Sequence, residues 1–410
     1  MTTQAVSHRI ATLRAGAPVL EFLTASPQAR RQNDPDAANF MVGNPHDLPL
    51  PEYVAALQRW SVPQDKDWFA YRHNDPGAQV VVAETLRARH GMPFASEDVI
   101  LTNGATGGIA AALGAVVDRG DEVIFLSPPW FFYETYILGA GAVPVRVKVD
   151  LATFDLDVDA IAAAITARTR AIIVNSPHNP TGKIYPPETL ERLAAVLTAA
   201  SARNGRPIYL LSDEAYSRIL YDGHTYPSPT RFYPASFLIY TYGKTLLTPG
   251  QRLGYVALPP NMPDREEVRG ALQVSQFTTG YAVANALLQH GLADLEALSI
   301  DIGHLQTRRD RMVAALRDMG YDVHVPEGTF YLLPRSPWPD DRAFADLLLT
   351  HDILVLPGTW VELPGYFRIS LTANDAMIDR ALPGFAAAAR QAAAGAPAGA
   401  AAQTGASAGA

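Results

Sequence analysis

The spacing of apolar residues changes repeatedly along the chain. From residue 80 onward, short apolar runs alternate with segments in which apolar residues recur at the spacing of a helix. Short apolar strands that alternate with helices are typical of a mainly parallel sheet covered on both faces. We therefore expect a large α/β domain. Its predicted strands are residues 99–101, 123–126, 143–149, 171–174 and 208–211, and its predicted helices are 80–90, 107–117, 136–138, 160–165 and 190–198.

The pattern changes after about residue 278, where a smaller α+β domain is predicted. One long helix, 295–319, carries Arg308, Arg309 and Arg311 on its expected solvent side. Short strands follow at 321–325, 329–333, 353–356 and 366–371. The predicted division is an N-terminal arm and part of the small domain at 1–47, the large domain at 48–277, the small domain at 278–386, and an Ala/Gly-rich tail at 387–410 whose composition predicts disorder.

Composition narrows the possible functions. The 410 residues carry a net charge of −8 and contain no dense run of Lys or Arg, which argues against binding to nucleic acid. The chain has no cysteine, so disulfides, thiolate metal ligands and cysteine nucleophiles are excluded, and we expect no metal. No apolar run is long enough to span a bilayer and no signal-peptide pattern is present. We expect a cytoplasmic protein that does not bind membranes.

A glycine-rich turn, 103–108, joins a predicted strand to a predicted helix. Free backbone N–H groups and the helix dipole at such a turn suit a phosphate. A dinucleotide is disfavoured, because the glycines do not fit G-x-G-x-x-G and the acids Asp121 and Glu122 precede the second strand instead of closing it. On this segment alone, a phosphate site and a purely structural turn are equally good interpretations.

Polar and aromatic residues follow three predicted strands, where α/β sheets place their ligands. Trp130 could stack on a planar heterocycle, and Asp213 could hold a heterocyclic nitrogen protonated. Asn179 and Tyr216 could bond a phenolate oxygen. Each residue also has a structural interpretation: packing for the aromatics, a turn for Asn179-Pro180, and a helix cap for Asp213.

Lys244 lies between two apolar runs, 237–240 and 253–258. A lysine costs free energy to bury as a cation, so it either reaches water or is kept for its amine. Taken alone, the lysine indicates only a side chain that extends to solvent.

Together these segments resemble the pyridoxal-phosphate-dependent aminotransferases of fold type I, in the class I/II group that includes aspartate aminotransferase. The resemblance covers roughly residues 35–385 and predicts a large domain with a mainly parallel central sheet plus a smaller α+β domain. The motifs that carry it are Asn179-Pro180-Thr181-Gly182, Asp213-Glu214-Ala215-Tyr216, Lys244 with Arg252-Leu253-Gly254-Tyr255, Gly328-Thr329-Phe330-Tyr331 and Phe367-Arg368-Ile369-Ser370.

The resemblance implies a role for each matching residue. Lys244 forms an aldimine with pyridoxal 5'-phosphate and then shuttles a proton, while Asp213 pairs with the pyridine nitrogen and makes the ring an electron sink. Asn179 and Tyr216 bond the ring hydroxyl, and Trp130 stacks on the ring. The phosphate is held by Gly104, Ala105, Thr106, Thr241 and Arg252. The substrate carboxylate is bound by Arg368 and the Gly43 backbone, with Asn179 and Trp130 nearby. Tyr71 and Thr279 match residues that reach the phosphate of a neighbouring subunit in a homodimer with shared active sites.

The implied reaction moves the amino group of an L-amino acid to a 2-oxo acid by a ping-pong mechanism. β-Elimination, decarboxylation and cyclisation on the same framework are the alternatives. Thr241 and Gly243 stand where the family commonly has Ser, and Gln251 stands where it often has Trp. No second arginine is evident for a side-chain carboxylate, so a dicarboxylic donor is not indicated. A DNA-binding regulator is disfavoured because the 40 residues before the α/β core show no helix-turn-helix pattern.

Overall fold

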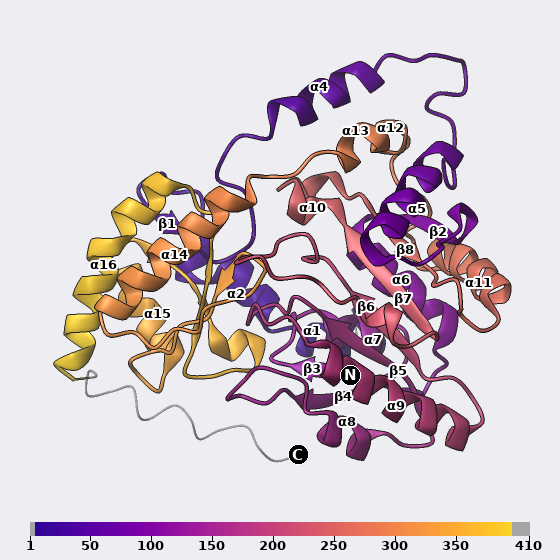
Figure 1. The fold of residues 1–410 in the computed structure, drawn as a ribbon. Coiled ribbons are helices and arrows are strands. Elements are labelled where there is room, and N and C mark those ends of the chain that lie inside the picture. The colour runs from indigo at the N-terminus through magenta and orange to yellow at the C-terminus, as the bar shows by residue number, and fades with distance from the viewer. Residues whose placement is uncertain (1–4, 396–410) are drawn as a thin grey trace. The chain divides into compact units, whose positions relative to one another are not determined.

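The computed structural model describes residues 5–395, and its largest element is a seven-stranded sheet of order β2-β8-β7-β6-β5-β3-β4 (Figure 1). Strands β3 to β7 run parallel to one another in this sheet, whereas β8 is antiparallel to both β2 and β7. The predicted α/β class with a mainly parallel sheet is therefore confirmed. The strands are β2 Val99–Thr102, β3 Glu122–Ser127, β4 Val143–Lys148, β5 Thr169–Asn175, β6 Tyr209–Asp213, β7 Ser236–Thr241 and β8 Gly254–Ala257.

Successive side chains of the central strands point to opposite faces of the sheet. On one face, Leu238 and Tyr240 pack with Leu86 of helix α5 in a buried cluster. On the other, a Cβ on Gly108 of helix α6 would come within 2.8 Å of Ile239, so α6 lies very close to the sheet. The helices of this part are α1 His8–Ala15, α4 Pro51–Trp60, α5 Pro76–His90, α6 Gly104–Val116, α7 Tyr133–Gly139, α8 Val158–Ala164, α9 Pro187–Asn204, α10 Tyr242–Thr245, α11 Arg265–Thr278, α12 Ala286–His290 and α13 Leu292–Glu296.

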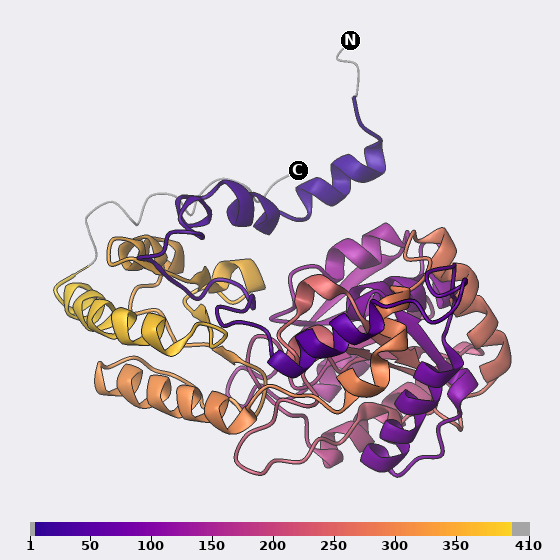
Figure 2. The same cartoon turned by 90° about the horizontal axis from the view of Figure 1, so that it is seen from above.

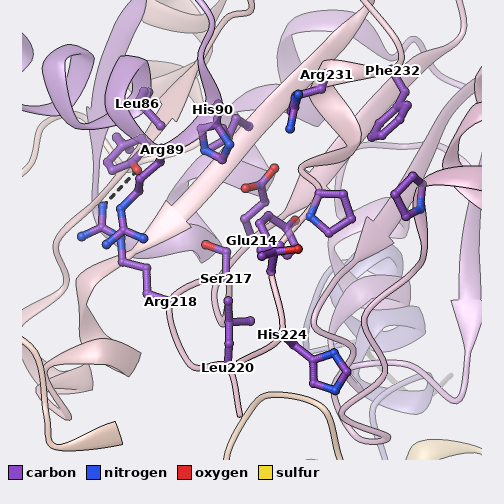
Figure 3. Close-up of a pocket in the computed structure, with 16 residues that line it drawn as sticks. Leu86, Arg89, His90, Glu214, Ser217, Arg218, Leu220, His224, Arg231 and Phe232 are labelled. Atoms are coloured by element: carbon purple, nitrogen blue, oxygen red, sulfur yellow. Dashed lines mark hydrogen bonds between the residues drawn. The ribbon is translucent and has the colours of Figure 1, made fainter. Parts of the chain in front are cut away.

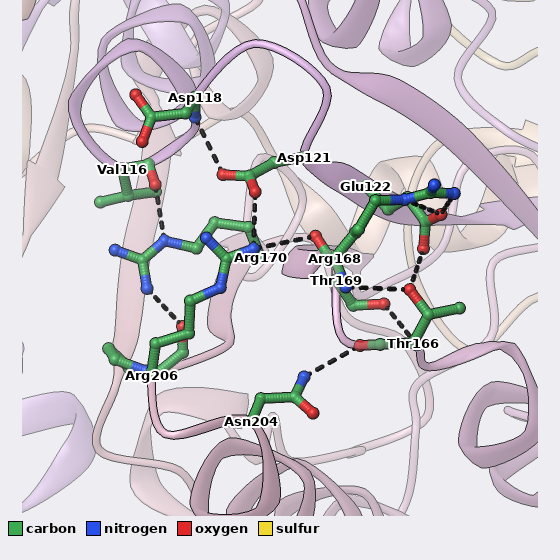
Figure 4. A network of polar contacts seen from close by, with 11 residues as sticks. Val116, Asp118, Asp121, Glu122, Thr166, Arg168, Thr169, Arg170, Asn204 and Arg206 are labelled. Carbon is green, nitrogen blue, oxygen red and sulfur yellow. Dashed lines mark hydrogen bonds and ion pairs between the residues drawn. The ribbon is translucent and has the colours of Figure 1, made fainter.

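A polar network ties together the amino-terminal ends of β3 and β5 (Figure 4). Glu122 accepts hydrogen bonds from Thr166 Oγ1 at 2.6 Å and from Arg168 Nε at 2.9 Å. Asp121 accepts from Arg206 at 2.5 Å. Burial and the surrounding donors act in opposite directions on Glu122, and the pKa of its carboxyl is lowered overall. The network fixes the edge of the sheet opposite to the one where the strands end.

The chain divides into two compact units. The first contains Leu48–Ile302, Glu327–Thr329 and the described residues up to Gly16; the second contains Ala17–Asp47, Gly303–Pro326 and the described residues from Phe330 onward. The domain boundary at 277/278 stays a prediction; by contacts, the first unit reaches Ile302. The elements of the second unit are α2 Val19–Ala25, α3 Pro27–Arg30, α14 Ile302–Asp318, α15 Asp341–Leu349 and α16 Asp375–Ala393, with strands β1 Ala38–Asn39, β9 Tyr331–Leu332, β10 Ile353–Leu354, β11 Leu356–Pro357 and β12 Phe367–Ser370.

Helices α14 and α16 of the second unit lie side by side in both views (Figures 1 and 2). The predicted helix 295–319 is wrong as one element, because α13 ends at Glu296 and α14 begins at Ile302. Arg308 and Arg309 are also not on a solvent face, since they are only 9% and 2% exposed. Arg308 pairs with Asp375 of α16 at 2.7 Å, and Arg309 donates to the Pro326 carbonyl at 3.1 Å.

The remaining differences lie in short strands and at the C-terminus. The strand predicted at 321–325 is reduced to an isolated bridge between Val323 and Pro334. Helix α16 continues to Ala393, beyond the point where disorder was predicted to begin, because alanine favours helix and Ala388 is buried. Residues 396–410 of the predicted tail lie outside the described residues. Within residues 5–395, no helix is both long and apolar enough to cross a membrane.

Candidate active site

The predicted site residues of the first unit collect at one edge of the large sheet. Gly104 follows β2, Asn179 follows β5, and Asp213 ends β6. Lys244 follows β7 by three residues, and Arg252 immediately precedes Leu253 and β8. Because β8 is antiparallel, its beginning lies at the edge where β2 and β7 end. The sheet topology thus places the five segments together.

Asp213 is a buried carboxyl group of this edge, with 6% of its surface exposed. Its carboxylate accepts a hydrogen bond from the Tyr133 hydroxyl at 2.5 Å. Burial raises the pKa of the Asp213 carboxyl, while Tyr133, the Ala215 N–H and the positive charge of Lys244 act in the opposite direction. The carboxyl is thus held in place by a neutral donor and lies within the field of a cation.

Tyr133 is the residue of this cluster that sequence reasoning missed. It opens α7, directly after the aromatic run of which only Trp130 was selected. The ring of Trp130 meets Tyr133 edge to face at a centroid distance of 5.4 Å and stacks with Tyr136 at 6.0 Å. Burial and the Asp213 carboxylate raise the pKa of Tyr133 well above its ordinary value, so its hydroxyl remains a donor.

Lys244 lies in the short helix α10, whose first turn is capped by Thr241. The Thr241 hydroxyl accepts from the Gly243 N–H at 3.3 Å, which sets the direction of the turn. Lys244 Nζ lies 5.7 Å from the centroid of the Tyr216 ring, and that ring is buried. The lysine amine is therefore directed toward the part of the edge that holds Tyr216 and Asp213.

Asn175 links the turn that carries Asn179 to the strand that carries Asp213. Its side-chain amide donates to the Asp213 carbonyl at 2.9 Å, and its Oδ1 accepts from the Asn179 N–H at 2.7 Å. Asn175 is itself buried, so both bonds are shielded from water. Asn179 is thereby fixed relative to Asp213 by one side chain that the sequence did not single out.

Gly104, Thr106, Thr241 and Arg252 form a compact cradle. Arg252 has a left-handed backbone, φ 56°, and its Nη2 donates to Thr106 Oγ1 at 2.6 Å and to the Asn103 carbonyl at 3.2 Å. Gly104 has φ 74°, and a Cβ there would lie 3.0 Å from Arg252 Nη2 and 3.4 Å from Thr241 Oγ1. Only glycine leaves this space open. Ala105 is buried in the same first turn of α6.

Tyr71 and Thr279, also in the first unit, were expected to act across a subunit interface. The Tyr71 side chain is fully exposed, and its neighbours Phe69 and Arg72 line a surface groove of about 310 Å³ with it. The Thr279 hydroxyl donates to the Ser275 carbonyl of its own helix at 2.7 Å. The exposed ring of Tyr71 is thus available to a partner.

The second unit holds the two residues expected to bind the substrate carboxylate. Arg368 of β12 is only 2% exposed, donates to the Met41 carbonyl at 3.0 Å and lies 4.1 Å from the Tyr331 ring centroid. Gly43 lies against Phe330 and Tyr331, where a Cβ would approach the Phe330 ring and the Tyr331 hydroxyl to 2.7 Å each. Within this unit, Arg368 and the Gly43 segment therefore share Tyr331 as a neighbour.

The chain is similar over nearly its whole length to known aminotransferases. The family profile of aminotransferase class I and II matches residues 35–385. The aspartate/prephenate aminotransferase of Thermus thermophilus is 32% identical, with 93% of this chain and 98% of the relative covered. A crystal structure of an amino transferase from Eubacterium rectale has a TM-score of 0.82 at 28% identity, covering 94% of this chain and 96% of that one. The structure of aspartate aminotransferase from Thermus thermophilus with maleate has a TM-score of 0.80 at 27% identity, covering 94% and 100%.

The fold and the groups at the sheet edge define a transferase of fold type I. More particularly, the chain belongs to the aminotransferase class I and II family. It is a transaminase that moves an amino group from an amino acid to a 2-oxo acid. β-Elimination, decarboxylation and cyclisation are not favoured, because the matched relatives are named aminotransferases.

Proposed function

We propose that this transaminase works with pyridoxal 5'-phosphate, bound at the edge of the large sheet where Asp213 and Lys244 lie. Three features of the first unit fit this cofactor. A buried carboxyl can accept from a protonated ring nitrogen, a cradle of Gly104 and Arg252 leaves space beside a cation for a phosphate, and a lysine lies within the field of that carboxyl. The single observation that carries the proposal is the buried pairing of Asp213 with Tyr133, close to Lys244.

When bound, the cofactor supplies an electron sink for the electrons of a bond broken at the substrate α-carbon. Asp213 holds the proton of the ring nitrogen through a charge-assisted hydrogen bond, and Tyr133 orients Asp213. Asn179 and Tyr216 bind the ring hydroxyl, and Trp130 lies against the ring. Lys244 would hold the cofactor covalently and, once freed from it, would carry a proton at Nζ as general base and acid.

The phosphate is assigned to the cradle described above. Arg252 supplies the positive charge, Thr106 and Thr241 supply hydroxyls, and the first turn of α6 supplies N–H groups at Gly104 and Ala105. These donors already lie in fixed positions because Arg252 is bonded to Thr106 and to the Asn103 carbonyl. Binding therefore requires little reorganisation of the chain.

Arg368 is assigned to the α-carboxylate of the substrate, in a bidentate pair assisted by the Gly43 backbone. Its guanidinium is already oriented by the Met41 carbonyl and the Tyr331 ring. Matched relatives are named for aspartate and prephenate. For this chain we infer that the donor is an L-amino acid. To identify it, the holoenzyme is mixed with single L-amino acids in the absence of a 2-oxo acid. The true donor bleaches the visible band and yields one equivalent of its own 2-oxo acid.

The assembly is proposed to be a homodimer in which each subunit contributes Tyr71 to the partner's phosphate. The exposure of Tyr71, together with that of Phe69 and Phe277, supports an apolar surface that a second subunit covers. The cytoplasmic location expected from the sequence stays a prediction.

The lysine assignment is tested by reducing the holoenzyme with borohydride and locating the attached pyridoxyl group by mass spectrometry. We expect it on Lys244, and we expect Lys244→Ala to lose attachment and turnover together. Lys148→Ala is the matched control, because Lys148 is an exposed lysine at the same edge of the sheet, at the end of β4. Attachment to any other lysine would sink the assignment.

A further inference from the structure

A second cavity, of about 630 Å³, lies in the first unit beside the strand that carries Asp213 (Figure 3). It is lined by the end of α5, by the loop that follows β6 and by residues of β7 and β8. Asp213 and Glu214 are consecutive, so their side chains leave the backbone on opposite sides, and Glu214 lines this cavity. The cavity is therefore distinct from the active-site edge and uses none of the residues assigned to the reaction.

Two arginines at the rim give the cavity an unbalanced positive charge. Arg89 and Arg231 are exposed, and among residues 5–395 neither has a carboxylate within ion-pair distance or a side-chain hydrogen bond. Arg218, deeper in the wall, is neutralised by Glu296 at 2.7 Å. The rim thus carries two cations without counter-ions, which an anion would satisfy.

His90 provides an unused polar group inside the cavity. It is 8% exposed, and its Nδ1 has no hydrogen-bond partner in the described part of the chain. Burial and the neighbouring Arg89, Arg231 and Arg218 lower the pKa of His90 to about 4, so the imidazole is neutral. A buried nitrogen without a partner carries a free-energy cost that a ligand can remove.

Glu214 would repel an anion if its carboxyl were ionised. Its Oε1 accepts from Ser212 at 2.9 Å and from Ser228 at 2.5 Å. Burial nevertheless raises the pKa of Glu214 to about 8. The carboxyl is therefore mostly neutral at pH 7 and can donate a hydrogen bond, whereas above pH 8 it becomes a negative charge in the cavity wall.

The apolar part of the wall includes Leu86, Leu220, Phe232 and Leu238, and Ser217, Thr225, Tyr226 and Tyr255 add hydroxyl groups to the lining. A volume of this size suits a small organic molecule, and apolar walls with a few placed polar groups are typical of ligand sites. We propose that this cavity is a second, non-catalytic binding site for a small organic anion that carries a carboxylate or phosphate group on an apolar body. Arg89, Arg231 and His90 bind the anionic group, and the apolar residues receive the body.

The proposal is tested by calorimetry on the holoenzyme with benzoate and phenyl phosphate, and with benzyl alcohol as the neutral counterpart. We expect one of the two anions to bind without changing the visible absorption of the cofactor, and benzyl alcohol to bind at least tenfold more weakly. The anion that binds more tightly shows whether the site prefers a carboxylate or a phosphate group. Binding that always perturbs the cofactor spectrum would place the ligand at the active site and overturn the proposal.

Variants locate the site. The double variant Arg89→Met, Arg231→Met should bind the anion at least about fivefold more weakly, because two charge contacts are lost. Arg203→Met is the matched control, since Arg203 is an exposed arginine of α9 that does not line the cavity. All three substitutions should leave transamination unchanged. Unaltered affinity in the double variant would overturn the proposal.

The pH dependence gives an independent measurement. The charged and titratable groups that line the cavity are Arg89, Arg218, Arg231, His90, His224, Glu214, Tyr226 and Tyr255. Burial raises the pKa of both tyrosines, so they stay neutral in this pH range. Between pH 7 and pH 9, the affinity of the wild-type protein should fall several-fold as Glu214 ionises, and Glu214→Gln should remove this fall. An equal fall in both proteins would show that the anion does not sense Glu214.

Discussion

The Tyr133 hydroxyl donates a hydrogen bond of 2.5 Å to the carboxylate of Asp213, at the end of the central strand β6. The two residues are 80 positions apart in sequence, and both are buried. Tyr133 thus governs how the Asp213 carboxylate is oriented and how readily it takes a proton.

Tyr133→Phe should therefore slow transamination about tenfold or more, because a hydrogen bond to a charged group is worth about 1.5–3 kcal/mol. The loss removes an interaction that lowers the pKa of Asp213, so the acid limb of the pH–rate profile should move to higher pH. Tyr233→Phe is the control, since Tyr233 bonds the Ile208 carbonyl far from the sheet edge. If both variants show the same pH profile, Tyr133 is merely structural.

Gly104→Ala should weaken the binding of pyridoxal phosphate to the apoenzyme. The added Cβ would push against Arg252 Nη2 at 3.0 Å and displace the cation of the cradle. Gly91→Ala is a matched control with the same kind of backbone, φ 65° against 74°, but with nothing within 4 Å of the new carbon. Both substitutions should cost about 1 kcal/mol of stability, whereas only Gly104→Ala should raise the Kd of the cofactor. An equal effect of both substitutions on that Kd would contradict the assignment of the phosphate to the cradle.

Stability should fall as the pH drops from 6.5 towards 4. Burial lowers the pKa of His178 to about 4, and burial with nearby arginines does the same for His90. Between these values the unfolded chain binds protons that the folded chain does not, so each histidine removes up to about 1.4 kcal/mol per pH unit. The free energy of unfolding is unaffected by the two histidines above pH 6.5. The loss that they cause on acidification levels off below pH 4. Urea midpoints of the wild-type protein and His178→Asn, measured from pH 7 to pH 4.5, should converge on acidification; parallel curves would contradict the assignment.

Mixing two inactive variants should restore activity if active sites are shared. Tyr71→Ala and Lys244→Ala each damage one component of the proposed site, and a hybrid dimer contains one site with both residues intact. Random pairing of equal amounts should regain about a quarter of wild-type activity after unfolding and refolding together. No regain in a mixture that sedimentation shows to be dimeric would mean that Tyr71 acts within its own subunit or not at all.

The sequence was most informative where local pattern and topology agree. Residues after predicted strands, such as Asn179, Asp213 and Tyr216, could be assigned to one edge because parallel strands end together. Tyr133 could not be found this way, since it lies in a run of aromatics and only the start of α7 decides which ring points at Asp213. Asn175 was missed because its role consists of two contacts that a strand-end residue makes only after the sheet has formed.

Long-range charge contacts explain the errors in the second unit. Arg308 has the polarity of a surface residue, yet its partners Asp47 and Asp375 are distant in sequence and cover it. The break between α13 and α14 lies in a stretch whose composition is compatible with continuous helix. Local propensity is a weak guide where tertiary contacts decide the outcome.

The connection between β7 and β8 holds both Lys244 and Arg252, and both strands lie inside the sheet with neighbours on either side. The Tyr242 N–H donates to the Leu253 carbonyl at 3.0 Å and closes the base of this loop. Amide hydrogens at that base can exchange with solvent only when the centre of the sheet opens. The separation between Lys244 and Arg252 is therefore protected by the global stability of the large unit, and binding or release of a small molecule at this edge need not alter it.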